Sequence, residues 1–169
     1  GNNCEIKIAL GTQSPDIKAG VDTSLESRKG AGEKIGAGDQ GMMIGYASNE
    51  SEDYMPLPIS ISHSITRKMA ELRKNNNLDW IRPDGKSQIT FEYDANGKPV
   101  RINTVVISTQ HNPNISQEDI KNELMEKVCD VAIPEKYLDS ETKFIINPSG
   151  QFIIGGPHGD AGLTGRKII

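Results

Sequence analysis

The sequence predicts a two-layer α+β domain, with helices packed on one face of a sheet. Two segments carry apolar residues at helical spacing, and several shorter segments alternate between apolar and polar residues. Between Gly41 and Ile146 these elements follow the order β-α-β-β-α-β. That order is the split βαβ arrangement of a ferredoxin-like sandwich. We therefore expect the helices to cover one face of the sheet, and solvent or another layer to meet the other face.

The first two expected strands lie on either side of a polar stretch. Cys4 to Leu10 alternates, with Ile6, Ile8 and Leu10 on one side, which is typical of a half-buried strand. Gly41 to Ala47 is mostly apolar and predicts a buried strand. Between them, Gly11 to Gly38 is rich in glycine and charge, and we expect it to be a loop.

The first helix begins at a proline-containing segment and ends at an asparagine run. Residues 55–58 contain two prolines, which stop strand pairing and favour a helix start. An apolar stripe follows at helical spacing; its members are Ile61, Ile65, Met69 and Leu72. Residues 75–77, all asparagine, are expected to end the helix.

A hairpin is expected next. Ile89, Phe91 and Tyr93 alternate with polar residues, and Asn96-Gly97 provides the positive φ of a tight turn. The return strand, Val100 to Ser108, contains a β-branched run.

The second helix and the last strands complete the domain. Ser116, three residues before Asp119, resembles a capping box. The buried stripe that follows consists of Ile120, Leu124, Val128 and Val131. Short strands are predicted at Lys143–Ile146 and Phe152–Ile154, on either side of a turn at residues 148–150.

Composition excludes several classes of protein. The 169 residues carry 19 Lys+Arg and 23 Asp+Glu, a net charge of −4, and 5% aromatic residues, which argues against a nucleic-acid binder. Apolar runs are too short to span a membrane. Cys4 and Cys129 have no metal or redox spacing and are expected to be reduced thiols of a cytosolic protein, although pairing remains open. The length suits one domain with pieces of its neighbours, or a small protein with irregular ends.

Three segments have the residue types of a binding site. In Gly36–Gly41, glycines permit close backbone approach and Asp39 can accept hydrogen bonds; the alternative is a capped turn. In Pro83–Ser87, Lys86 is a cation suited to phosphate; the alternative is a turn with an exposed lysine. Gly155–Gly165 offers backbone N–H groups to an anion, next to Arg166 and Lys167.

Other signatures are missing. Lys167 is not followed by Ser or Thr, so the last segment is not a P-loop. His158 is interpreted as a polar loop residue. No zinc-like spacing and no G-x-S-x-G motif occurs.

Five motifs, in order along the chain, resemble those of S-adenosylmethionine synthetases (methionine adenosyltransferases). Gln13–Ile17 resembles Q-S-P-D-I, and Gly36–Ala47 resembles G-A-G-D-Q-G-L-M-F-G-Y with the following alanine. Trp80–Gln88 resembles W-L-R-P-D-x-K-S-Q, and Ser108–His111 matches S-T-Q-H. Ile154–Ile169 resembles I-G-G-P-x-G-D-x-G-L-T-G-R-K-I-I.

The resemblance implies synthesis of S-adenosylmethionine from ATP and L-methionine, followed by hydrolysis of tripolyphosphate to pyrophosphate and phosphate. It assigns methionine binding to Gln13, Asp39 and Asp160. It assigns ATP binding to Asp84, Gly85, Lys86, Gln151, Phe152, Asp160, Arg166 and Lys167. Of these, Lys86, Arg166 and Lys167 would be catalytic cations. Gln151 stands where the family commonly has Arg, which puts a side-chain contact to ATP there in doubt.

The resemblance also implies Mg²⁺ and K⁺ as cofactors, no metal ligands within this sequence, and a cytoplasmic dimer or dimer of dimers with shared active sites. It predicts no nucleic-acid or membrane partner. The family's H-P-D-K and later glycine-rich lysine segments are missing from this sequence, so we expect a piece of a longer polypeptide that is inactive alone. The alternative function is a non-catalytic ferredoxin-like binding or interaction module.

The resemblance also suggests domain boundaries. Residues 1–38 would be the end of an N-terminal domain plus a mobile active-site loop, 39–154 the central domain, and 155–169 the start of a C-terminal domain. The Gly11–Gly38 segment lies between Gln13 and Asp39, two expected site residues, so we expect a lid over the site. The alternative is a passive linker.

Overall fold

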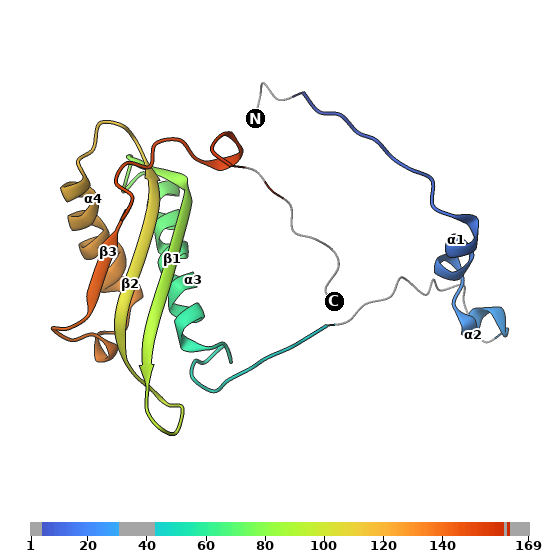
Figure 1. The fold of residues 1–169 in the computed structure, drawn as a ribbon, viewed down its shortest axis with the longest axis horizontal. Coiled ribbons are helices and arrows are strands. Elements are labelled where there is room, and N and C mark those ends of the chain that lie inside the picture. Colours follow the sequence, from blue (N-terminus) through green and yellow to red (C-terminus); the bar gives the residue numbers. More distant parts are fainter. Residues whose placement is uncertain (1–4, 31–42, 161, 163–169) are drawn as a thin grey trace. The chain divides into compact units, whose positions relative to one another are not determined.

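The computed structural model describes residues 5–30, 43–160 and 162, and these residues fall into two units divided between Ile44 and Gly45. The first unit contains two short helices, α1 (Pro15–Asp22) and α2 (Leu25–Arg28). The second contains all the described strands and the other described helices (Figure 1). Each unit is described by itself below.

The second unit is a two-layer α+β domain, which confirms the predicted class. Its sheet has the order β1-β2-β3, with β1 (Ile81–Tyr93) antiparallel to β2 (Pro99–His111) and β2 parallel to β3 (Lys143–Ile146). Helices α3 (Leu57–Lys74) and α4 (Gln117–Leu124) lie together on one face of this sheet (Figure 1). The domain also contains α5 (Asp130–Ala132), the π-helix η1 (Met125–Cys129) and two short 3₁₀-helices, η2 (Glu135–Tyr137) and η3 (Gly156–His158).

A single apolar core fills the space between the helices and the sheet. Its fully buried members come from α3, from the first and second strands, and from the α4–η1 helix, and include Ile65, Ile102, Val105, Ile107, Ile120 and Leu124. The opposite face of the sheet is more open, and Ile145 of β3 is 40% exposed there. The helices therefore cover only the face of the sheet that contributes to the core.

Helix α3 has the predicted stripe and ends. Ile61, Ile65, Met69 and Leu72 are all buried. Asn76 has φ 55°, the Asn76 N–H donates to the Arg73 carbonyl, and the Asn77 N–H donates to the Leu72 carbonyl. These two bonds form a Schellman motif, in which Asn tolerates the left-handed conformation that ends the helix.

The predicted hairpin joins β1 to β2. The Gly97 N–H donates to the Asp94 carbonyl, and Gly97 has φ 76°, a conformation that glycine adopts without strain. The Asp94 carboxylate accepts hydrogen bonds from the backbone N–H groups of Asn96 and Lys98. These bonds hold the pKa of Asp94 below its usual value, with the Lys98 N–H contributing most.

The second helix departs from the predicted stripe in its last turn. Ser116 caps its start as expected, accepting from the Asp119 N–H at 3.0 Å. Ile120, Leu124 and Val128 are buried, but Val131 is 63% exposed and Cys129 is fully buried instead. The cause is the π-helical turn η1, which inserts one extra residue and rotates everything after it. Spacing alone does not show that insertion.

The first two predicted strands do not form in the described residues. Among residues 5–10 and 43–47 no strand is present, and their apolar side chains are exposed, from 76% at Tyr46 to 91% at Leu10. An alternating pattern becomes a strand only where a neighbour supplies the backbone hydrogen bonds. β2 and β3 pair directly with each other, and residues 43–47 are not part of the described sheet.

Two expectations near the predicted site also change. Residues 83–87, expected as a turn, lie inside β1, where the register shifts between Ile81 and Gly85. Pro83 lacks an N–H group, so the strand bulges there instead of turning. Phe152–Ile154 is not a strand, although Phe152 exchanges two hydrogen bonds with His111.

The polar segment expected as a loop contains α1 and α2. Pro15 begins α1, and the Lys18 ammonium pairs with Asp22 at 2.7 Å, one helical turn away. None of the eight residues of α1 is buried. Residues 31–38 lie outside the described part of the chain, so the lid and linker interpretations both remain predictions.

Cys129 is a free, buried thiol. Burial, with a smaller contribution from Asp130, raises its pKa to about 12, so it stays protonated at neutral pH. Cys4 lies outside the described residues. None of the helices described here is long and apolar enough to cross a bilayer.

The π-helical turn can be tested with two valines of the same helix. Val128→Ala removes about two buried methyl groups and should lower the free energy of unfolding by about 1.5–2 kcal/mol, whereas Val131→Ala should change it by less than about 0.5 kcal/mol. Urea denaturation of the whole chain measures both values. Equal losses for the two variants would mean that the helix continues without the π turn.

Candidate functional site

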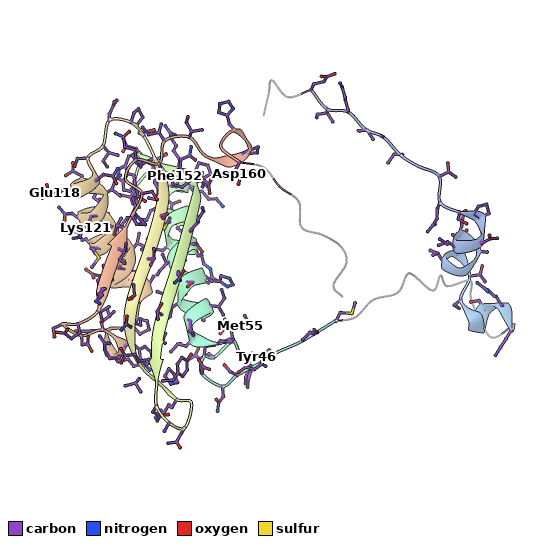
Figure 2. All side chains as sticks on the ribbon, in the orientation of Figure 1. Tyr46, Met55, Glu118, Lys121, Phe152 and Asp160 are labelled. Atoms are coloured by element: carbon purple, nitrogen blue, oxygen red, sulfur yellow. The ribbon has the colours of Figure 1, made fainter. Side chains whose placement is uncertain are left out.

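A pocket of about 230 Å³ lies beside the ends of β1 and β2. Its lining comes from three separate parts of the sequence: Lys86, Ser108, Asn147, Ser149, Gly150, Gln151 and Phe152. Figure 2 shows Phe152 and Asp160 at one end of the domain, with Met55 and Tyr46 toward the other. The pocket therefore brings together three predicted ATP-binding residues, Lys86, Gln151 and Phe152.

The floor of the pocket is a cross-strand pair. Lys86 of β1 lies directly opposite Ser108 of β2 in the antiparallel register. The neighbours of Ser108, Ile107 and Thr109, are fully buried, so Ser108 lies on the opposite side of the sheet from the core. Lys86 is exposed, and its ammonium group is available to a ligand. The pair offers one cation and one hydroxyl to an anionic or polar group.

The wall of the pocket is the loop that follows β3. The Gly150 N–H donates to the Asn147 carbonyl at 2.8 Å, which closes the predicted turn. Asn147 and Gly150 have φ 43° and 85°, values that asparagine and glycine tolerate best. This reversal of direction leads from β3 to Gln151 and Phe152 at the pocket.

Asn147 continues the sheet with its side chain. Its backbone N–H donates to the Ile107 carbonyl, as the next residue of β3 would. Its side-chain oxygen then accepts from the Thr109 N–H at 2.8 Å, and its amide nitrogen donates to the Thr109 carbonyl at 3.4 Å. The carboxamide thus replaces a peptide group beside β2. Asn147 is only 6% exposed, so these bonds form away from water.

Asp84 holds the glycine-rich segment that follows the pocket. Its carboxylate accepts the Gly156 N–H at 3.0 Å, and the Gln110 amide donates to the Ile153 carbonyl at 2.9 Å. A Cβ on Gly155 would lie 2.8 Å from the Gln110 side chain and 3.0 Å from Asp84. A side chain at position 155 would therefore require the Gln110 side chain to shift.

Three other predicted site residues of the second unit, Asp84, Gly85 and Asp160, do not line the pocket. Gly85 does not line it, and a Cβ there would lie 2.9 Å from the Met69 side chain, in the core. Asp84 bonds to Gly156 and also lies outside the lining. Asp160 is exposed just after η3, and Gln13 is exposed just before α1 in the first unit. Asp39, Arg166 and Lys167 lie outside the described residues. The roles of all of these remain predictions.

Sequence reasoning did not assign four of the lining residues: Ser108, Asn147, Ser149 and Gly150. A signal existed for each. Ser108 opens the S-T-Q-H motif, and the other three belong to or precede the predicted turn. What the sequence lacked was the register that sets Ser108 against Lys86.

Within residues 5–30, 43–160 and 162 no group of three or more His, Cys, Asp or Glu side chains is placed to hold a metal ion. The described residues therefore do not fit a Mg²⁺ site.

Fold and site define a two-layer α+β domain with a pocket of about 230 Å³ beside its sheet. Residues 34–152 match the family model of the S-adenosylmethionine synthetase central domain. The chain belongs to the S-adenosylmethionine synthetase family, as the five motifs predicted.

The hydrogen bonds of Asn147 give a stability prediction. Asn147→Gly keeps the positive φ but leaves the buried Thr109 N–H without its acceptor, which should cost about 1–3 kcal/mol of unfolding free energy. The matched control is Asn76→Gly, because Asn76 also has a positive φ but is exposed at the end of α3. Chemical denaturation compares the two, and similar midpoints would contradict the bonding described for Asn147.

Proposed function

We propose that this chain forms part of the active site of a methionine adenosyltransferase, and that the pocket beside Lys86 binds ATP. The observation that carries the proposal is the pocket itself. In a domain of this family, it joins a cation, a hydroxyl and an aromatic side chain from distant parts of the sequence, Lys86, Ser108 and Phe152. Such a set suits a ligand with both a ring and an anionic group.

The reaction proposed is a direct displacement. A lone pair of the methionine sulfur forms a bond to C5′ of the ribose, and the bond between C5′ and the bridging oxygen breaks. The electron pair leaves with tripolyphosphate, and sulfur becomes a sulfonium cation. Water then cleaves tripolyphosphate to pyrophosphate and phosphate. Because the sulfur is neutral and carries no proton, the first step needs positioning and charge stabilisation, and no general base.

Lys86 is proposed to stabilise the leaving group. Negative charge grows on the triphosphate as the C5′–O bond breaks, and a fixed ammonium group lowers the energy of that charge most in the transition state. Phe152 offers an aromatic surface for adenine. For Gln151 the proposed contact is its backbone. Arg166 and Lys167 are proposed to add further positive charge, and Asp39, Gln13 and Asp160 to bind methionine.

The remaining parts of the proposal concern the complete protein. We propose that Mg²⁺ and K⁺ are held mostly by residues outside this sequence, and that active sites are shared in a cytoplasmic homo-oligomer. Residues 1–38 are proposed as the end of an N-terminal domain with a mobile active-site loop, 39–154 as the central domain, and 155–169 as the start of a C-terminal domain. The sequence predicted that Asp84 contacts ATP. Because its carboxylate accepts a hydrogen bond from the Gly156 N–H, we propose that backbone groups next to Asp84, and not its carboxylate, contact ATP.

The role of Lys86 is tested by substitution in the complete synthetase polypeptide. Removing one group that stabilises developing charge commonly costs about 10²–10³ in rate, so Lys86→Ala should slow S-adenosylmethionine formation by that factor. The control is Lys143→Ala, which removes an exposed lysine of β3 in the same sheet. A loss below about fivefold for Lys86→Ala, roughly 1 kcal/mol, would make it a surface cation.

The function itself is tested by product analysis. The complete polypeptide, given ATP and methionine, should form S-adenosylmethionine with one pyrophosphate and one phosphate per turnover. The 169-residue chain alone should form none, because the charged segments expected of the family's site are missing from it. Failure of the complete polypeptide to make product, with no ATP binding, would favour a non-catalytic interaction module. Turnover by the isolated chain would show that it already holds a full site.

A further inference from the structure

We propose that His111 is a positioning residue for the nucleotide pocket, which holds the backbone of Phe152 and thereby sets where its ring lies. The inference rests on the proposed function, because it concerns the same pocket. His111 ends β2 and is 2% exposed. It does not line the pocket, so its effect on a ligand must pass through another residue.

His111 contacts Phe152 with both its backbone and its side chain. The His111 N–H donates to the Phe152 carbonyl at 2.9 Å, and the Phe152 N–H donates to Nε2 of the His111 ring at 3.1 Å. Both polar groups of the Phe152 backbone are therefore held by one residue. Fixing the backbone at two points sets the direction in which the side chain leaves the chain, and Phe152 lines the pocket.

The hydrogen bonds also define the state of the ring. Nε2 accepts the Phe152 N–H, so it carries no proton in this arrangement. The proton is on Nδ1, which lies 2.8 Å from the Asn112 carbonyl and donates to it. The Gln117 amide nitrogen lies 3.2 Å from Nε2 and approaches the same acceptor. Imidazole is suited to this position because it presents a donor and an acceptor on opposite sides of one small ring.

The ring is itself held by the network under the pocket. The Gln117 amide oxygen accepts from the Asn147 side chain at 3.4 Å, and Asn147 bonds to Thr109 two residues before His111. Asn147 also lines the pocket, whereas His111 and Gln117 do not. Asn147 and Phe152 both line the pocket. They are thus connected to each other through Gln117 and the buried His111.

Two substitutions test the proposal in the complete synthetase polypeptide. His111→Leu fills the site but leaves the Phe152 N–H without an acceptor, and should raise KM for ATP about tenfold with kcat changed less than about twofold. His111→Gln keeps an acceptor on a side chain of similar reach, and should restore KM to within about threefold of the original. KM for methionine should stay unchanged in both.

The control is Val128→Ala, which destabilises the same domain by emptying space in the core on the helix side. It should leave KM for ATP unchanged. If His111→Leu leaves KM for ATP unchanged, or if Val128→Ala raises it equally, the proposal is wrong. A wild-type protein that binds no ATP would overturn the proposed function instead.

A spectroscopic readout decides the proposal without activity and also serves if His111→Leu fails to fold. Long-range ¹H–¹⁵N correlation of the 169-residue chain should show His111 protonated at Nδ1 and unprotonated at Nε2. The Phe152 amide should exchange with solvent more slowly than that of Ser149, which is exposed in the same loop. The opposite tautomer, or fast exchange at Phe152, would overturn the proposal.

Discussion

Thr109 and His111 are two polar residues buried at the end of β2. The hydrogen bonds that they require determine the path of the chain from Asn147 to Phe152, beside the pocket. Buried polar groups are costly unless they are hydrogen-bonded. β3 stops at Ile146, opposite Ile107, so it cannot satisfy the last backbone groups of β2. The side chain of Asn147 does so at Thr109, and the backbone of Phe152 does so at His111. The residues between Asn147 and Phe152 are left to loop outward, and they form the pocket wall.

Residues 108–111 of β2 contribute side chains to both faces of the sheet. Ser108 lines the pocket on the more open face, while Thr109 belongs to the buried face that the helices cover. Successive residues of a strand point to opposite faces, so a stable core and a ligand surface can share one short segment. Gln110 then fixes Ile153 by its side chain. Four consecutive residues, Ser108 to His111, thus connect the core to the site.

A charged residue in a recognised motif can have a structural role, and Asp84 illustrates this. Its motif suggests contact with nucleotide, yet its carboxylate accepts the Gly156 N–H. The bond holds the glycine-rich segment beside β1, where a Cβ at position 155 would meet the Gln110 side chain at 2.8 Å. The motif therefore joins residues of different roles: Lys86 faces the pocket, and Asp84 arranges the chain around it.

Local sequence determined much of this protein by itself. The stripe of α3, the cap at Ser116 and the Asn96-Gly97 turn follow from spacing and backbone preference, which act over a few residues. The motifs also predicted the family, which the match over residues 34–152 confirms.

Tertiary structure decided which predicted strands form, which helical residues are buried and which residues meet at the pocket. Each of these depends on contacts between parts of the chain that are distant in sequence. Residues 5–10 have the pattern of a strand, but within residues 5–30, 43–160 and 162 no segment pairs with them to supply hydrogen bonds. Val131 has the spacing of a core residue, but the π turn before it moves it to the surface. The pairing of Lys86 with Ser108, and the hold of His111 on Phe152, join residues 22 and 41 positions apart. Such contacts depend on register and loop path, which only the packed chain determines.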